Sequence, residues 1–88
     1  MRSIVFHEDT LQTYEYFRET NKIIHKKLFN IIKEMQKGDP TQGTGKPEAL
    51  KYELAGYYSR RLSDKDRLIY SFDKENIYII AIGGHYEE

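Results

Sequence analysis

Cysteine is absent from this sequence of 88 residues, which excludes disulfide bonds and zinc sites built on thiolates. No apolar run approaches the roughly 18 residues that a membrane-spanning helix needs. The first residues, Met1-Arg2-Ser3-Ile4, lack the long apolar stretch of a secretory signal. These absences predict a protein of the reducing cytoplasm whose fold depends on packing alone.

The sequence also lacks net charge, because 14 basic residues balance 14 acidic ones. That balance argues against a uniformly basic nucleic-acid-binding protein. Positive charge is nevertheless concentrated: residues 22–37 hold five lysines and one glutamate, and residues 46–67 hold six basic and four acidic side chains. Phosphate backbones select such clusters, but charge alone favours the simpler interpretation of a solvated helix face.

The length allows a single domain, residues 1–88, and the first half of it predicts one strand and two helices. Residues 2–7 alternate in polarity, as a strand does. Asp9 or Thr10 can cap a helix to about residue 19, and Thr20-Asn21 can cap a second helix to about residue 37. The apolar residues of the second helix recur at helical spacing: Ile24, Leu28, Ile31 and Met35.

The second half predicts a loop and then strands. Residues 38–47 hold three glycines and two prolines and form the loop. The predicted strands cover residues 50–54, 57–62, 66–72 and 77–82. The last is apolar on both sides and should lie centrally. The order predicts an α+β fold, with an N-terminal strand and an antiparallel helical hairpin on one face of a mostly antiparallel sheet of four to five strands.

The sheet face without helices should carry arginine and tyrosine. Strand alternation places Tyr57, Ser59 and Arg61 on one side of their strand, and Arg67 on the side of its strand that points away from the core. Arginine binds phosphate through a planar fork of donors, and tyrosine offers a ring for base stacking. The pattern suits single-stranded RNA, and it suits an ordinary solvated sheet surface equally well.

Several side chains have the types needed to cleave RNA without a metal. The 2′-OH of RNA can attack the adjacent phosphate if a base, an acid and cations are in place. Glu48 stands where the loop enters a strand, and His85 and Tyr86 follow the last strand. Together with Arg61 and Arg67 they form a possible set, although the residue types alone are weakly specific.

A metal or phosphate-loop site is not predicted. His7 and His25 have no partner at metal-ligand spacing. The stretch Gly43-Thr44-Gly45-Lys46-Pro47 lacks the four residues between glycines, and the following helix, of a P-loop. We therefore expect neither a metal nor another cofactor.

Four stretches carry a family resemblance: Gly43-Thr44-Gly45-Lys46-Pro47-Glu48-Ala49-Leu50-Lys51, Gly56-Tyr57-Tyr58-Ser59-Arg60-Arg61-Leu62, Asp66-Arg67-Leu68-Ile69-Tyr70 and His85-Tyr86. They resemble, in register, the Gly-x-Gly-Lys-Pro-Glu-x-Leu-Lys, Gly-aromatic-aromatic-Ser-Arg-Arg, Arg-Leu-Val/Ile-Tyr and terminal His-Tyr motifs of the YoeB (Txe/YoeB) toxins. Residues 14–22 are similar to the same family. The resemblance spans nearly the whole chain.

The resemblance implies a RelE/YoeB-like fold and an mRNA interferase, a toxin that enters the ribosomal A site and cleaves mRNA there. It implies that Glu48 is the general base, Arg67 stabilises the phosphate, and His85 is the general acid. Tyr86 would stack on or orient the nucleotide. The cations implied to bind phosphate and RNA are Lys46, Lys51, Arg60 and Arg61.

The implied partners are mRNA, the 70S ribosome and a YefM-like antitoxin that inhibits the toxin and represses the operon with it; the family can also form homodimers. One alternative is a ParE-like toxin directed at DNA gyrase, against which the retention of Glu48, Arg67 and His85 argues. Another is a binding module with decayed catalysis that acts with an antitoxin as co-repressor.

The C-terminal end departs from the family pattern, since Gly83-Gly84 precedes His85 and Glu87-Glu88 follows Tyr86. Two glycines favour a mobile tail, and two carboxylates oppose RNA electrostatically. We predict that deleting Glu87-Glu88 leaves growth arrest on induction equal or stronger, measured against the full chain at matched expression. Weaker arrest would show that the two glutamates contribute to activity.

Overall fold

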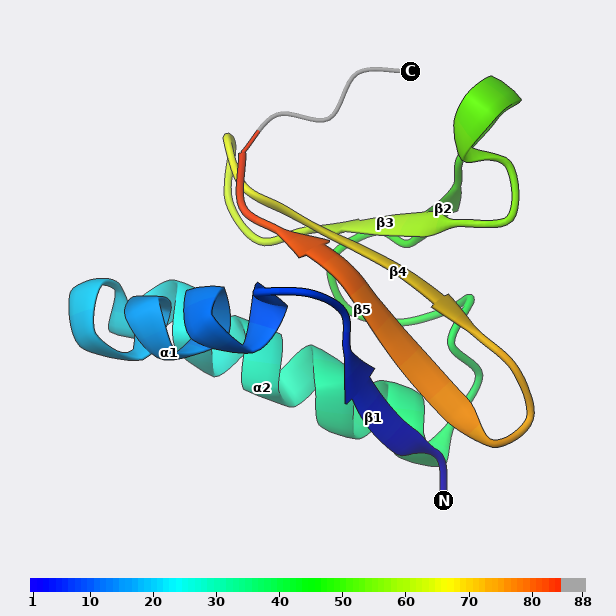
Figure 1. Ribbon diagram of the computed structural model, residues 1–88, viewed down its shortest axis with the longest axis horizontal. Helices are drawn as coiled ribbons and strands as arrows, with labels where there is room; N and C mark the ends of the chain where they lie inside the picture. The colour runs from blue at the N-terminus through cyan, green and yellow to red at the C-terminus, as the bar shows by residue number, and fades with distance from the viewer. Residues whose placement is uncertain (85–88) are drawn as a thin grey trace.

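The computed structural model describes residues 1–84. Five strands form one sheet in the order β1-β5-β4-β3-β2, and two helices pack against it (Figure 1). The strands are β1 (Ser3–Phe6), β2 (Glu48–Ala49), β3 (Tyr58–Arg61), β4 (Arg67–Phe72) and β5 (Asn76–Ile82), and the helices are α1 (Thr10–Thr20) and α2 (Lys22–Lys37). The predicted α+β fold class is confirmed, with strand pairs that are antiparallel except for β1 and β5.

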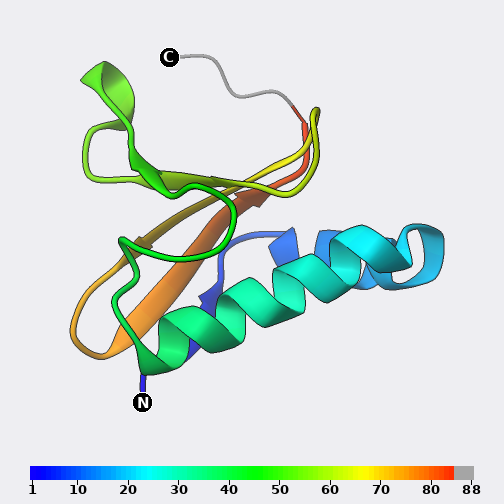
Figure 2. The ribbon, with the colours of Figure 1, turned by 180° about the vertical axis from the view of Figure 1, so that it is seen from behind.

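The two helices form the expected antiparallel hairpin, and α2 runs across the sheet as its main cover (Figure 2). Only Asn21 separates them. Its side-chain Oδ1 accepts a hydrogen bond from the Ile24 amide, 3.2 Å away, and so caps α2 as predicted. Among residues 1–84, no helix is both long and apolar enough to cross a membrane.

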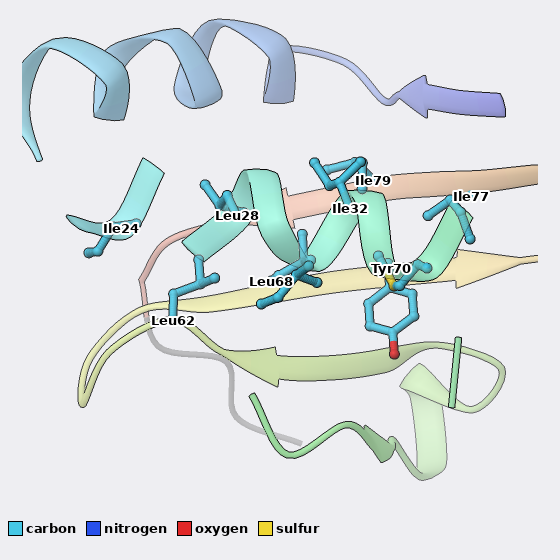
Figure 3. Close-up of a cluster of buried hydrophobic side chains, with 10 residues drawn as sticks. Ile24, Leu28, Ile32, Leu62, Leu68, Tyr70, Ile77 and Ile79 are labelled. Atoms are coloured by element: carbon cyan, nitrogen blue, oxygen red, sulfur yellow. The ribbon is translucent and has the colours of Figure 1, made fainter. Parts of the chain in front are cut away.

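The hydrophobic core lies between α2 and the strands β4 and β5 (Figure 3). Its members are buried side chains from both layers: Ile24, Leu28, Ile31, Ile32, Met35, Leu62, Leu68, Tyr70, Ile77 and Ile79. The four helical positions predicted from spacing all belong to it. β5 pairs with β1 on one side and β4 on the other, so its predicted central position is confirmed.

The strand predicted over residues 50–54 is wrong. The structure has a two-residue strand, β2, just before that segment, and a short 3₁₀ helix, Tyr52–Leu54, within it. The cause is a backbone turn: Tyr52 has a φ of 58°, a left-handed conformation that no strand residue adopts. The Leu50 amide still donates to the Tyr57 carbonyl at 2.9 Å, after which the two chains separate.

A pair of substitutions on α2 tests this division between core and surface. Leu28 is fully buried, so we predict that Leu28→Ala lowers the free energy of unfolding by about 2–5 kcal/mol. Ile23 is 82% exposed, and Ile23→Ala should change it by less than about 0.5 kcal/mol. Urea denaturation of both variants measures the contrast, and equal losses would contradict the assigned orientation of α2.

Candidate functional site

The sheet face opposite the helices brings together side chains from β2, β3 and β4. Glu48 on β2 pairs with Ser59 on β3, and Ser59 pairs with Ile69 on β4. Two residues farther along β3, Arg61 pairs with Arg67 on β4. Directly paired residues share a face, so the prediction that Ser59, Arg61 and Arg67 lie on one side of the sheet is confirmed.

Glu48 and Arg67 meet across β3, although 18 residues separate them in the chain. The Oε1 atom of Glu48 lies 4.0 Å from Nη1 of Arg67. The Glu48 side chain is 67% exposed and that of Arg67 is 26% exposed. The carboxylate is thus open to a ligand, while the guanidinium beneath it is held in place with part of its surface accessible.

Arg61 and Arg67 form a cross-strand pair of like charges. Like charges directly opposite each other destabilise a strand pair. The two guanidinium groups therefore favour an anion bound between or above them, and a phosphate group is the anion that arginine binds best through paired donors.

The end of β5 lies beside Arg67. The Gly83 amide donates to the Arg67 carbonyl at 2.8 Å, and the Gly84 amide donates to Oδ1 of Asp66 at 3.3 Å. Gly83 and Gly84 have φ values of 87° and 73°, which side-chain-bearing residues rarely adopt. The glycine pair thus lets the chain leave the sheet sharply at this point.

The predictions for His85 and Tyr86, like those for tail mobility and for Glu87-Glu88, lie outside the described residues. The described residues end at Gly84, immediately before His85 in the sequence. The preceding residue, Gly83, bonds to the Arg67 carbonyl. Their assigned roles remain predictions.

The loop over residues 38–47 joins β3 next to Arg61. The Gly45 carbonyl accepts a hydrogen bond of 2.7 Å from the Arg61 amide. A Cβ atom on Gly45 would come within 2.8 Å of the Arg61 carbonyl oxygen, so glycine permits this close approach. Lys46 and Lys51 flank Glu48 in sequence and both are exposed. Phosphate binding by these lysines and by Arg61 remains a prediction.

Arg60 requires a correction, because the prediction that it binds RNA phosphate is wrong. It has no exposed surface and lies on the core face of β3, opposite Leu68. Its five N–H donors all have partners within the protein: Tyr70 Oη at 3.1 Å, Glu34 Oε1 at 2.8 Å, and the carbonyls of Thr44 at 2.9 Å, Pro40 at 2.9 Å and Gln42 at 2.8 Å. No donor is left for a ligand, so Arg60 orders the loop.

Glu34 and Tyr70 complete the arrangement around Arg60. Burial alone would raise the pKa of Glu34, but hydrogen bonds from Thr44 and Arg60, with the charge of Arg60, hold it below its usual value. Burial raises the pKa of the Tyr70 hydroxyl against the opposing effect of Arg60. That hydroxyl donates to the Pro40 carbonyl at 2.6 Å. An ionised glutamate and a neutral tyrosine therefore surround the guanidinium.

Sequence reasoning missed Asp66 and the partners of Arg60. Asp66 accepts from Ser63 Oγ at 3.0 Å and from Gly84, so it joins the β3–β4 turn to the end of β5. The Ser-x-x-Asp spacing of that turn was the available signal. Strand alternation was sufficient to place the Arg60 side chain on the core side, because Arg60 alternates in step with Tyr58 and Leu62, which face the core.

Within residues 1–84, no cluster of three or more histidine, cysteine, aspartate or glutamate side chains could hold a metal ion.

Comparison with known proteins places the chain among bacterial toxins. A family model described as the YoeB-like toxin of bacterial type II toxin–antitoxin systems matches residues 6–86. Toxin YoeB of Escherichia coli O6:H1 is 39% identical over 83 residues, covering 94% of this chain and 98% of that protein. The YoeB dimer from Staphylococcus aureus superposes with a TM-score of 0.87 at 36% identity, covering 97% of this chain and 98% of that one. The YoeB-YefM complex from Staphylococcus aureus gives 0.86 at 37% identity, with coverages of 98% and 99%.

The lowered pKa of Glu34 predicts how stability depends on pH. A carboxyl whose pKa is lower in the folded state stabilises the fold above its unfolded pKa, about 4.3, and loses that effect as pH falls through the folded pKa. Wild type should therefore exceed Glu34→Gln in free energy of unfolding near pH 6, and the difference should shrink below about pH 4. Urea denaturation at several pH values measures this, and parallel curves would contradict it.

Proposed function

This chain belongs to the YoeB-like toxin family of bacterial type II toxin–antitoxin systems, and we propose that it is a metal-free endoribonuclease that cleaves mRNA in the ribosomal A site. The observation that carries the proposal is the approach of Glu48 to Arg67 on the open face of the sheet, 4.0 Å apart. A carboxylate and a guanidinium at this separation can contact a ribose 2′-OH and the adjacent phosphate together. Arg61 adds a second cation at the same place.

Each described residue takes a role that its geometry supports. Glu48, the more exposed of the pair, accepts the proton of the 2′-OH as the 2′-oxygen attacks phosphorus. Arg67 is held by strand pairing and stabilises the negative charge that accumulates on the phosphate oxygens. Arg61, Lys46 and Lys51 bind the neighbouring backbone phosphates.

The leaving 5′-oxygen needs a proton as its bond to phosphorus breaks. His85 donates it, and Tyr86 stacks on the nucleotide or orients it. Both residues follow Gly84 in the chain, and Gly83 bonds to the Arg67 carbonyl, which supports their assignment to this site.

The proposed partners follow from the ribosomal substrate and from the relatives. We assign mRNA and the ribosome as targets in the bacterial cytoplasm, and a YefM-like antitoxin as the inhibitor. The structures from Staphylococcus aureus include a YoeB-YefM complex and a YoeB dimer. By that likeness this chain binds an antitoxin and also forms a homodimer.

Substitutions at the site test the proposed chemistry in a reconstituted translation reaction and with purified RNA. Glu48→Gln and His85→Ala should each lower the rate of mRNA cleavage by about 10²–10⁴, because each removes a proton-transfer group. Arg67→Met should lower it by about 10²–10³ through loss of charge stabilisation. Wild-type cleavage should persist in EDTA with free RNA as substrate. The strength of growth arrest on induction should rank the variants in the same order as their cleavage rates.

Matched controls lie on α1, outside the strands that form the site. Glu15 and Arg18 form an exposed ion pair, so Glu15→Gln and Arg18→Met remove the same groups and should leave cleavage unchanged. If Glu48→Gln and His85→Ala arrest growth as wild type does, the catalytic assignment fails. Arrest without RNA cleavage would favour a gyrase-directed toxin, and operon repression without arrest would favour a co-repressor module.

A further inference from the structure

The loop that precedes Lys46 and Glu48 is held by hydrogen bonds from a side chain on the core face of the sheet. Arg60 lies between Ser59 and Arg61 on β3, and its side chain points to the core while theirs point to the candidate site. We propose that Arg60 is a positioning residue, which fixes Lys46 and Glu48 by clamping the loop that precedes them. Its catalytic consequence rests on the proposed function.

The clamp consists of three backbone carbonyls within five residues. The two terminal nitrogens of the Arg60 guanidinium donate to Pro40, Gln42 and Thr44, at 2.8–2.9 Å. Tyr70 adds a second contact to Pro40 through its hydroxyl. The loop is thereby attached at alternate residues, just ahead of the segment that crosses to the open face.

Glu34 links the same loop to helix α2 through hydrogen bonds. Its carboxylate accepts bonds of 2.8 Å from the Thr44 amide and from Thr44 Oγ1, as well as from Arg60. Gly43 leaves the space that Glu34 fills, since a Cβ atom there would collide with the carboxylate. The loop is therefore bound between a strand and a helix.

The flanking residues of β3 carry the constraint to the candidate site. The Arg61 amide bonds to the Gly45 carbonyl, and Ser59 pairs with Glu48. Three consecutive residues of one strand thus hold the chain on both sides of Lys46. A loop that shifts on the core side would move Lys46 and Glu48 relative to Arg67.

Lysine cannot replace arginine in this position. An ammonium group offers its donors from a single nitrogen, whereas the clamp needs a planar fork that reaches several acceptors at fixed spacing. Arg60→Lys therefore keeps the charge and loses the geometry, which makes it the informative substitution.

The test compares Arg60→Lys and Glu34→Gln with wild type in RNA cleavage, well below their unfolding temperatures. We expect kcat to fall by about 10²-fold for Arg60→Lys, because small misplacement of a catalytic group has that effect. KM should change much less, since the phosphate-binding cations remain. Ile24→Val, a core substitution at the end of α2 opposite to Glu34 and the loop, should leave both constants unchanged.

Amide hydrogen exchange gives a readout that does not depend on catalysis. Exchange of the Thr44 and Arg61 amides should accelerate at least about tenfold in both loop variants and not in Ile24→Val. If Arg60→Lys does not fold, Glu34→Gln decides, because Glu34 is 39% exposed and tolerates a neutral isostere. If the loop variants have the same kcat and the same amide exchange rates as wild type, the proposal is overturned. An inactive wild type would instead refute the proposed function, and the exchange data would still decide on the clamp.

Discussion

The buried guanidinium of Arg60 is the constraint on which the arrangement of this molecule depends. Taking a charge out of water costs several kcal/mol unless partners replace the lost hydration. All five donors are satisfied, by one carboxylate, one hydroxyl and three loop carbonyls. Removing one partner of such a buried pair typically costs about 3–5 kcal/mol. Since the partners come from α2, β4 and the loop, the loop cannot take another position without leaving part of the charge uncompensated.

The two adjacent arginines of β3 consequently have different functions. Arg60 points to the core and determines where the loop lies, whereas Arg61 points to the open face and pairs with Arg67. The nearby carboxylate of Glu48 offsets part of the repulsion between Arg61 and Arg67, and a bound anion would offset more of it. The core face thus orders the loop, whereas the open face presents two guanidinium groups, one of them beside Glu48, whose positive charge suits a phosphodiester. In this chain, two consecutive residues of one strand thus point to opposite faces of the sheet, one to the core and the other to the candidate site.

Much of this could be predicted from the sequence, where local pattern and tertiary packing agree. The spacing of Leu28 and Ile31 identified the buried side of α2, and alternation in β3 and β4 identified the face of Arg61 and Arg67. Residues 50–54 could not be predicted, because their alternation resembles a strand and the left-handed Tyr52 is invisible to periodicity. Arg60 was assigned to phosphate through the family resemblance, although strand alternation already places it on the core side. Its partners could not be predicted, because those in the loop and the helix lie 16–26 residues away in the chain. Contacts at that range follow from the assembled fold and not from local pattern.

In the proposed reaction the RNA itself supplies the nucleophile, and Glu48 beside Arg67 activates it. Attack by the 2′-OH forms a bond between the 2′-oxygen and phosphorus and releases the 5′-oxygen, whereas attack by water can release the 3′-oxygen. End-group analysis of the RNA fragments produced by purified protein on translating ribosomes distinguishes them directly. We expect upstream fragments that end in a 2′,3′-cyclic phosphate or in its 3′-phosphate hydrolysis product, and downstream fragments that begin with a 5′-hydroxyl. Fragments with a 3′-hydroxyl and a 5′-phosphate would contradict the proposed reaction.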